Sequence, residues 1–212
     1  MKIALIGASG FIGSALREEA LSRGHQVSAL VSQPDKLDAS VKNLQVVKVD
    51  VQDTDALTNQ LVETEVVISA FSGHAQEDVR GYYVQGVKSI IAAAKEAGKR
   101  LLMVGGAGAL QLPDGSLLID SPQFPQEYKA TALGAQDALA LLQQEQVLDW
   151  TMLAPAAEIF PGERSGQFRL GKDQLLMDDK GNSRISVQDY AQALLDEVEQ
   201  PQHPRQRFTL AY

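Results

Sequence analysis

The first glycine turn of the chain reads Gly7-Ala8-Ser9-Gly10-Phe11-Ile12-Gly13. It follows an apolar segment at 3–6 and precedes a helical pattern at 11–22. Between a strand and a helix, glycines at such a spacing allow a tight turn, a close approach of a diphosphate to the backbone, and close packing of the helix on the sheet. The N–H groups at the start of the helix attract phosphate, and the Ser9 hydroxyl adds a donor. The turn therefore predicts binding of a dinucleotide.

Short apolar runs alternate with helical patterns along most of the chain. Runs of consecutive apolar residues are typical of parallel strands that are covered on both faces. The alternation predicts an α/β fold with a Rossmann-like, doubly wound parallel sheet in the order 3-2-1-4-5 plus later strands, and a ligand crevice at the carboxyl ends of strands 1 and 4. The expected strands are 3–6, 27–31, 44–49, 66–70, 101–104 and 151–154, and the expected helices are 11–22, 78–97, 129–146 and 187–199.

The 212 residues contain no internal repeat and no low-complexity linker, which predicts a single domain over 1–212. Two regions interrupt the alternation, at 111–125 and 158–184. We expect the second to form a small substrate-side subregion, with a hairpin around 178–182. Ser186, three residues before Asp189, resembles a capping box that opens the last helix.

The composition restricts the partners. A formal net charge of −8, without a run of Lys and Arg, argues against nucleic acid and against anionic membranes. The chain has no cysteine, which excludes disulfides and thiolate chemistry, and no apolar run is long enough to cross a bilayer. The first residues enter a glycine turn instead of forming a signal peptide. We therefore expect a cytoplasmic protein with a small-molecule substrate. The sequence is compatible with a homodimer.

The residues after the second strand bear on the choice between NAD(H) and NADP(H). An NAD site usually has an acidic residue there, which binds the ribose 2′-hydroxyl. This chain has Ser32 and Gln33, with neither an acid nor an arginine. Ser32 and Lys36 can together receive a 2′-phosphate, which favours NADP(H). Lys36 fits a solvated lysine equally well, so NAD(H) stays open.

Other cofactor contacts follow from the expected topology. The end of strand 3, at 50–51, is expected beside the adenine, and the end of strand 4, at 69–71, over the ribose and the nicotinamide side. Three glycines in 105–108 leave bare backbone that can approach the nicotinamide, although a flexible loop root would look similar. The contact residues predicted in this way are Asp50, Val51, Ser69, Ala70, Phe71, Gly105, Gly106 and Ala107.

Tyr128 is a candidate proton donor. Short-chain dehydrogenases use a tyrosine whose pKa is lowered by a lysine four residues later. Here the fourth residue is Ala132, and Lys129 is adjacent to the tyrosine, so that it lies on a different face of a helix. The Tyr-x-x-x-Lys pair is therefore absent from this region, and Tyr128 fits a packed or pocket-wall residue as well as a proton donor.

Among the three histidines, His74 follows strand 4 and is the one that can face a substrate, although a solvated loop histidine fits its position as well. His25 precedes strand 2 and is expected to be structural, and His203 lies between two prolines and is expected to be a solvated loop residue. No pair has metal-ligand spacing, so we expect no metal.

Several motifs together resemble the atypical short-chain dehydrogenase/reductases, and more narrowly the bacterial NAD(P)H-binding proteins known as NADH-flavin reductases. The motifs are the glycine turn and the segments 103–108, 149–157, 161–164, 184–191 and 207–209. The resemblance implies a Rossmann fold, bound NAD(P) with Pro155 among its contacts, and reduction of flavins or similar acceptors. Relatives commonly carry arginine where this chain has Ser32, and often a hydroxyl residue where it has Ala109.

These features favour an NAD(P)H-dependent reductase of a flavin, quinone or similar conjugated acceptor. Such a reaction needs little side-chain chemistry, since the cofactor delivers the hydride. A non-catalytic NADP(H)-binding redox sensor is the alternative. A sugar-nucleotide epimerase or dehydratase is disfavoured, because the Tyr-x-x-x-Lys pair and a sizeable C-terminal substrate domain are missing.

Overall fold

In the computed structural model, which describes residues 1–74 and 76–212, eight strands form one sheet in the order β3-β2-β1-β4-β5-β6-β10-β8. The pairing is parallel from β3 to β10, and only β8 joins antiparallel. The strands are β1 (Lys2–Ile6), β2 (Gln26–Val31), β3 (Leu44–Lys48), β4 (Val66–Ser69), β5 (Arg100–Val104), β6 (Trp150–Ala154), β8 (Arg169–Gly171) and β10 (Gln206–Ala211). The Rossmann-like order 3-2-1-4-5 is confirmed.

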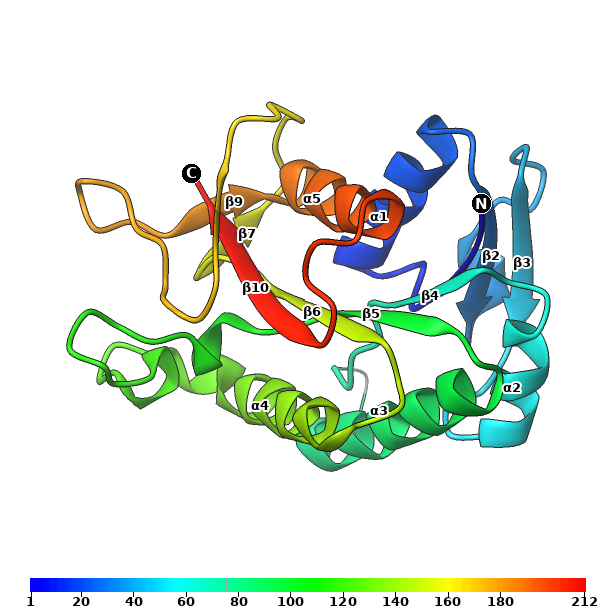
Figure 1. Ribbon diagram of the computed structural model, residues 1–212, viewed down its shortest axis with the longest axis horizontal. Coiled ribbons are helices and arrows are strands. Elements are labelled where there is room, and N and C mark those ends of the chain that lie inside the picture. Colours follow the sequence, from blue (N-terminus) through cyan, green and yellow to red (C-terminus); the bar gives the residue numbers. More distant parts are fainter. Residues whose placement is uncertain (75) are drawn as a thin grey trace.

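Helices cover both faces of the sheet (Figure 1). Helices α1 and α5 lie together on one face, and α2, α3 and α4 lie on the other. Their bounds are α1 (Phe11–Ser22), α2 (Thr54–Leu61), α3 (Val79–Glu96), α4 (Lys129–Gln144) and α5 (Val187–Glu199). Short 3-10 turns are η1 (Pro34–Lys36), η2 (Ala107–Ala109), η3 (Leu118–Asp120) and η4 (Gln126–Tyr128). Helix α2 and the strands β8 and β10 were not predicted from the sequence.

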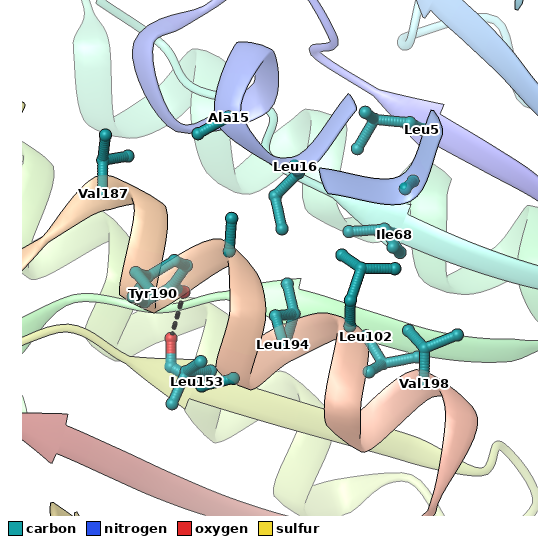
Figure 2. Close-up of a cluster of buried hydrophobic side chains, with 14 of the residues drawn as sticks. Leu5, Ala15, Leu16, Ile68, Leu102, Leu153, Val187, Tyr190, Leu194 and Val198 are labelled. Atoms are coloured by element: carbon teal, nitrogen blue, oxygen red, sulfur yellow. Dashed lines mark hydrogen bonds between the residues drawn. The ribbon is translucent and has the colours of Figure 1, made fainter. Parts of the chain in front are cut away.

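Each helical layer buries its own apolar cluster against the sheet. Figure 2 shows the cluster under α1 and α5, where Leu16 and Leu194 meet strand residues such as Leu102. The buried Tyr190 hydroxyl donates to the Leu153 carbonyl oxygen at 2.7 Å. Because burial disfavours the phenolate, the pKa of Tyr190 is raised. This hydrogen bond ties α5 to β6 through the core.

The segment 158–184 differs from the expected hairpin. Asp178 and Asn182 do close a turn through backbone hydrogen bonds. The strands on either side pair elsewhere, because β8 pairs with β10, whereas β9 (Arg184–Ser186) pairs with β7 (Glu158–Phe160) in parallel. The segment therefore contributes a strand to the main sheet, and the predicted hairpin was wrong: only a turn forms at 178–182.

Ser186 caps α5, as its sequence pattern predicts, but the reciprocal half of a capping box is missing. The Ser186 hydroxyl accepts from the Asp189 N–H at 3.0 Å. The Asp189 carboxylate instead accepts from the Ser165 hydroxyl at 2.6 Å, the Gly166 N–H at 2.8 Å and the Tyr212 hydroxyl at 2.7 Å. Asp189 thus attaches both the 158–184 segment and Tyr212 to α5.

Candidate functional site

The glycine turn stands at the carboxyl end of β1, where neighbouring backbone leaves no room for side chains at its outer glycines. A β-carbon on Gly7 would lie 2.6 Å from the Ala70 carbonyl oxygen, and Gly7 has a φ of +78° that favours glycine. A β-carbon on Gly13 would lie 2.0 Å from the Gly7 carbonyl oxygen. Gly10 meets only the Gly7 oxygen, at 3.5 Å. Two of the three glycines are therefore required by the packing of the turn.

Helix α1 begins without a side-chain cap. Its N-cap is Gly10, whose backbone is extended, and the first turn contains no acidic residue. Gly10 and Phe11 are exposed, and Ser9 and Ile12 are partly exposed. The N–H groups of this turn can therefore meet an anion, and no carboxylate of the first turn opposes it. This geometry fits the diphosphate of a dinucleotide.

The sheet places the other predicted contacts along the same carboxyl edge. Asp50 is exposed, with its Oδ1 accepting from the Gln52 N–H at 2.9 Å, and Val51 is buried. Ser69 is buried, and its hydroxyl is 3.4 Å from the Phe71 N–H. Ala70 lies beside the turn, because its carbonyl oxygen is the atom that crowds Gly7. Residues 50–51 and 69–71 thus stand on neighbouring parts of the edge, on both sides of β1.

Phe71 is held firmly at the exit of β4. Its ring stacks on Tyr83, with the centroids 5.8 Å apart, and lies 5.6 Å from the ring centroid of Tyr82. A β-carbon on Gly86 would lie 2.4 Å from the Phe71 ring, so this helical glycine makes the space for it. Tyr83 is buried, which raises its pKa. The result is a rigid aromatic group next to the glycine turn.

The loop after β5 has little room for side chains on its glycines. A β-carbon on Gly105 would lie 2.8 Å from Met152, and one on Gly106 would lie 2.9 Å from the β-carbon of Ala135. Ala107 starts η2, and Pro155, at the end of β6, is buried. The close packing argues against a loose loop root at Gly105.

Arg207, which belongs to the 207–209 motif and was not a predicted site residue, connects this loop to the 158–184 segment. Its Nη1 donates to the Ala109 carbonyl oxygen at 2.9 Å, and its Nη2 is 2.5 Å from Asp173 Oδ1. Gln111 exchanges backbone hydrogen bonds with Asp173 and Leu175 in the same place. The segment 172–175 therefore lies against the loop that follows β5, as a substrate-side wall would. Only the fold shows this contact, because 98 residues separate Arg207 from Ala109.

The two candidate proton donors lie on the surface. Tyr128 is 57% exposed at the end of η4, and His74 is exposed after β4. Ser32 and Lys36 are exposed as well, at and after the end of β2. Among residues 1–74 and 76–212, no charged side chain pairs with Tyr128 or His74, so any proton transfer through them would occur in contact with water.

The other two histidines have structural roles. His25 Nε2 is 2.7 Å from Glu199 Oε1, as expected of a structural residue. His203 was expected to be a solvated loop residue, and this was wrong. Its Nδ1 is 2.8 Å from the buried Glu197, and its ring stacks on Phe208 with the centroids 4.1 Å apart. The prolines on either side of His203 indicate a loop, and the sequence does not show that its ring packs in this way.

Across residues 1–74 and 76–212, no group of three or more His, Cys, Asp or Glu residues has the geometry of a metal site. In the same part of the chain, no helix is long and apolar enough to span a bilayer. Two hollows, of 560 and 400 Å³, lie away from the carboxyl edge. One is between α3 and α4, and the other is near the amino ends of β1 and β2. Neither includes a predicted contact residue.

Comparison with known proteins agrees with this geometry. A family model described as NAD(P)H-binding matches residues 7–201. The uncharacterized protein YwnB of Bacillus subtilis is 39% identical over 99% of this chain and 98% of its own. A structure described as a "putative epimerase" from Bacteroides thetaiotaomicron is 42% identical, with a TM-score of 0.92 over 100% of this chain and 96% of that one. A "putative NADH-flavin reductase" from Streptococcus pneumoniae is 33% identical, with a TM-score of 0.88 over 100% and 99%.

Proposed function

The chain belongs to the NAD(P)H-binding family, and on that premise we propose that it is an NAD(P)H-dependent oxidoreductase that reduces a flavin, a quinone or a similar conjugated acceptor. The observation that carries the proposal is the glycine turn. Backbone atoms 2.6 and 2.0 Å from the ideal β-carbons of Gly7 and Gly13 allow no side chain there, and α1 begins with uncapped N–H groups. The two glycines allow the tight turn that exposes these N–H groups, and the exposed N–H groups fit the diphosphate of the cofactor.

In this proposal the residues of the chain bind and orient the cofactor. The N–H groups at the start of α1 hold the diphosphate, and the fixed ring of Phe71 supports the ribose and nicotinamide side. Gly105 and Gly106 allow bare backbone to approach the nicotinamide, and Pro155 lines the same edge. The bound reduced nicotinamide supplies a hydride to the acceptor.

The acceptor must also gain a proton, and the candidate donors are Tyr128 and His74. Both are exposed, so bulk water can supply the same proton. A flavin or quinone tolerates this arrangement, because its conjugated ring accepts the hydride without a strong acid beside it. Ketone reduction, by contrast, depends on a tyrosine activated by a lysine, and Tyr128 has Ala132 four residues later. This difference favours a flat conjugated acceptor.

A second candidate function is a redox sensor that binds the cofactor without turnover. The exposure of both candidate proton donors favours it, since binding needs neither of them. An epimerase activity would require an acid–base pair at the nicotinamide. The missing Tyr-x-x-x-Lys pair disfavours it here, whatever the relative with that name does.

The test is a titration of the purified protein with NADH and NADPH, followed by turnover with FMN, FAD and a soluble quinone. We expect cofactor binding and acceptor-dependent oxidation of the reduced cofactor. The matched control is Gly10→Asp, which suits the extended N-cap backbone but places a carboxylate where the diphosphate belongs. Cofactor binding without turnover would favour the redox sensor. The absence of cofactor binding would overturn both the oxidoreductase and the sensor proposals.

We further propose a cytoplasmic location, a small-molecule substrate and NADP(H) as the preferred cofactor. The preference rests on the end of β2, where Ser32 replaces the acid that an NAD site usually has. Size-exclusion chromatography of the same preparation tests whether the protein is a homodimer.

A further inference from the structure

The guanidinium of Arg17 contacts the backbone of the glycine turn. Its Nη1 donates to the Ala8 carbonyl oxygen at 3.1 Å, so the side chain folds back along α1 toward the N-terminal end of the helix. The side chain is only 17% exposed. Its Nη2 is 3.7 Å from a carboxylate oxygen of Glu18, a residue that is itself 71% exposed, so this ion pair is weak. The guanidinium is thus fixed by one hydrogen bond and has further N–H donors to offer.

The flank of α1 that carries Arg17 faces away from α5. Glu19 marks the opposite flank, because it pairs with Arg164 of the segment that runs beside α5. Residues two apart in a helix point roughly 200° apart. Figure 1 shows α1 between α5 on one side and β2 and β3 on the other. The flank of α1 that carries residue 17 is therefore the one turned away from α5, and α1 packs against β2 as well as against α5.

The end of β2 lies next to the glycine turn. The Gly7 N–H donates to the Leu30 carbonyl oxygen at 3.1 Å. Ala8 and the residues after Leu30 therefore begin next to each other. Ser32, two residues beyond Leu30, is exposed. No carboxylate occurs between Ser32 and Pro34, and the first one, on Asp35, is exposed on η1.

We propose that Arg17 binds the 2′-phosphate of NADP(H) and thereby sets the preference over NAD(H). This inference rests on the proposed function. A guanidinium held in place by the Ala8 carbonyl loses little side-chain freedom on binding, and its planar donors suit phosphate. Ser32 adds a hydroxyl donor. Lys36, exposed on η1, contributes long-range attraction that salt screens. The selectivity of this chain is thus assigned to its first helix, in place of an arginine after β2.

The test compares wild-type protein with Arg17→Gln, Arg17→Lys and Lys36→Gln. Dissociation constants are measured for NADPH and NADH, and for the fragments adenosine 2′,5′-bisphosphate and 5′-AMP. We expect Arg17→Gln to weaken NADPH and the bisphosphate roughly 10- to 100-fold, as for a charge-assisted hydrogen bond, while NADH and 5′-AMP change less than about twofold. Arg17→Lys should retain part of the preference, and Lys36→Gln should reduce it only slightly, at low salt.

Equal losses for NADPH and NADH in a folded Arg17→Gln variant would show that Arg17 only holds the turn, and would overturn the inference. A preference that disappears in Lys36→Gln and persists in Arg17→Gln would assign the phosphate to η1 instead. Wild-type protein that binds NADH as tightly as NADPH would also contradict the inference while leaving the proposed function intact. Failure of the wild type to bind either dinucleotide would overturn the proposed function itself. Thermal unfolding shows whether each variant is folded. If Arg17→Gln does not fold, Arg17→Lys still tests the inference.

Discussion

A β-carbon added to Gly13 would lie 2.0 Å from the carbonyl oxygen of Gly7, a separation that real β-carbons essentially never show. Gly13→Ala must therefore push α1 away from the turn, and we expect it to lower the free energy of unfolding by about 3 kcal/mol. Chemical denaturation measures the loss. Gly10→Ala is the matched control, because its β-carbon would lie 3.5 Å from the same oxygen, and we expect a change of less than about 1 kcal/mol. Equal losses in the two variants would contradict the crowding argument.

Gly10→Asp separates stability from cofactor binding. Gly10 has the extended backbone of an N-cap, and aspartate is a preferred N-cap residue. We expect the variant to be as stable as the wild type or more so, but to bind NADPH at least about tenfold more weakly, because its carboxylate takes the N–H groups and repels the diphosphate. Calorimetry and the fluorescence of the reduced cofactor measure the two properties. Undiminished NADPH binding would place the diphosphate elsewhere.

Asp189 predicts a pH-dependent loss of stability. Burial raises the pKa of its carboxyl group, but hydrogen bonds from Ser165, Gly166 and Tyr212 outweigh that effect, and the net pKa is lowered. A lowered folded-state pKa means that the stabilisation is complete above the unfolded pKa, about 3.9, and is lost as the pH falls through the folded value. We expect Asp189→Asn to cost about 2 kcal/mol at neutral pH, and the difference from the wild type to shrink below about pH 4.

Urea unfolding at a series of pH values measures this difference. The control is Asp196, an exposed residue of the same helix as Asp189, which pairs with Arg23 at the end of α1. Asp196→Asn should cost less than about 1 kcal/mol. A cost for Asp189→Asn that does not depend on pH would contradict the assigned role of its carboxylate.

Arg207 predicts a variant that affects the acceptor more than the cofactor. Its guanidinium joins Ala109, in the loop after β5, to Asp173. Arg207→Lys cannot make both contacts with the same geometry, so the 172–175 wall should loosen. We expect KM for the acceptor to rise roughly threefold or more, while the Kd of NADPH changes less than about twofold. Steady-state kinetics and a binding titration distinguish the two effects, and a parallel loss of cofactor binding would contradict the wall assignment.

Tyr128 and His74 predict small effects on a conjugated acceptor. A positioned general acid contributes roughly 10²- to 10⁴-fold to a rate. Because both side chains are exposed and water can replace them, we expect Tyr128→Phe and His74→Gln each to lower kcat less than about tenfold with a quinone. A larger loss in either variant would identify that residue as the proton donor and would reopen the possibility of a carbonyl substrate.

Elements with strong local signals were predictable from the sequence. Helices α1 and α5 have the predicted bounds, because an apolar face and clear start signals define each of them. The elements that were missed depend on distant partners. β8 has three residues, all at least partly exposed, and it forms because β10 offers its edge. α2 is short and polar, and packing against α3 supports it.

The glycine turn and its chemistry follow from the chain alone, because strand, turn and helix are consecutive and glycine is the one residue without a β-carbon. Only the tertiary structure decided which groups the charged side chains contact. Asp189 accepts from the Ser165 hydroxyl, Arg207 donates to the Ala109 carbonyl oxygen, and Glu197 contacts the His203 ring. The place of Arg17 beside the turn likewise required the fold, since one helix flank looks like another until α5 covers one of them. Local periodicity specifies which segments pack, whereas the partner of a buried charge depends on the whole arrangement of the sheet.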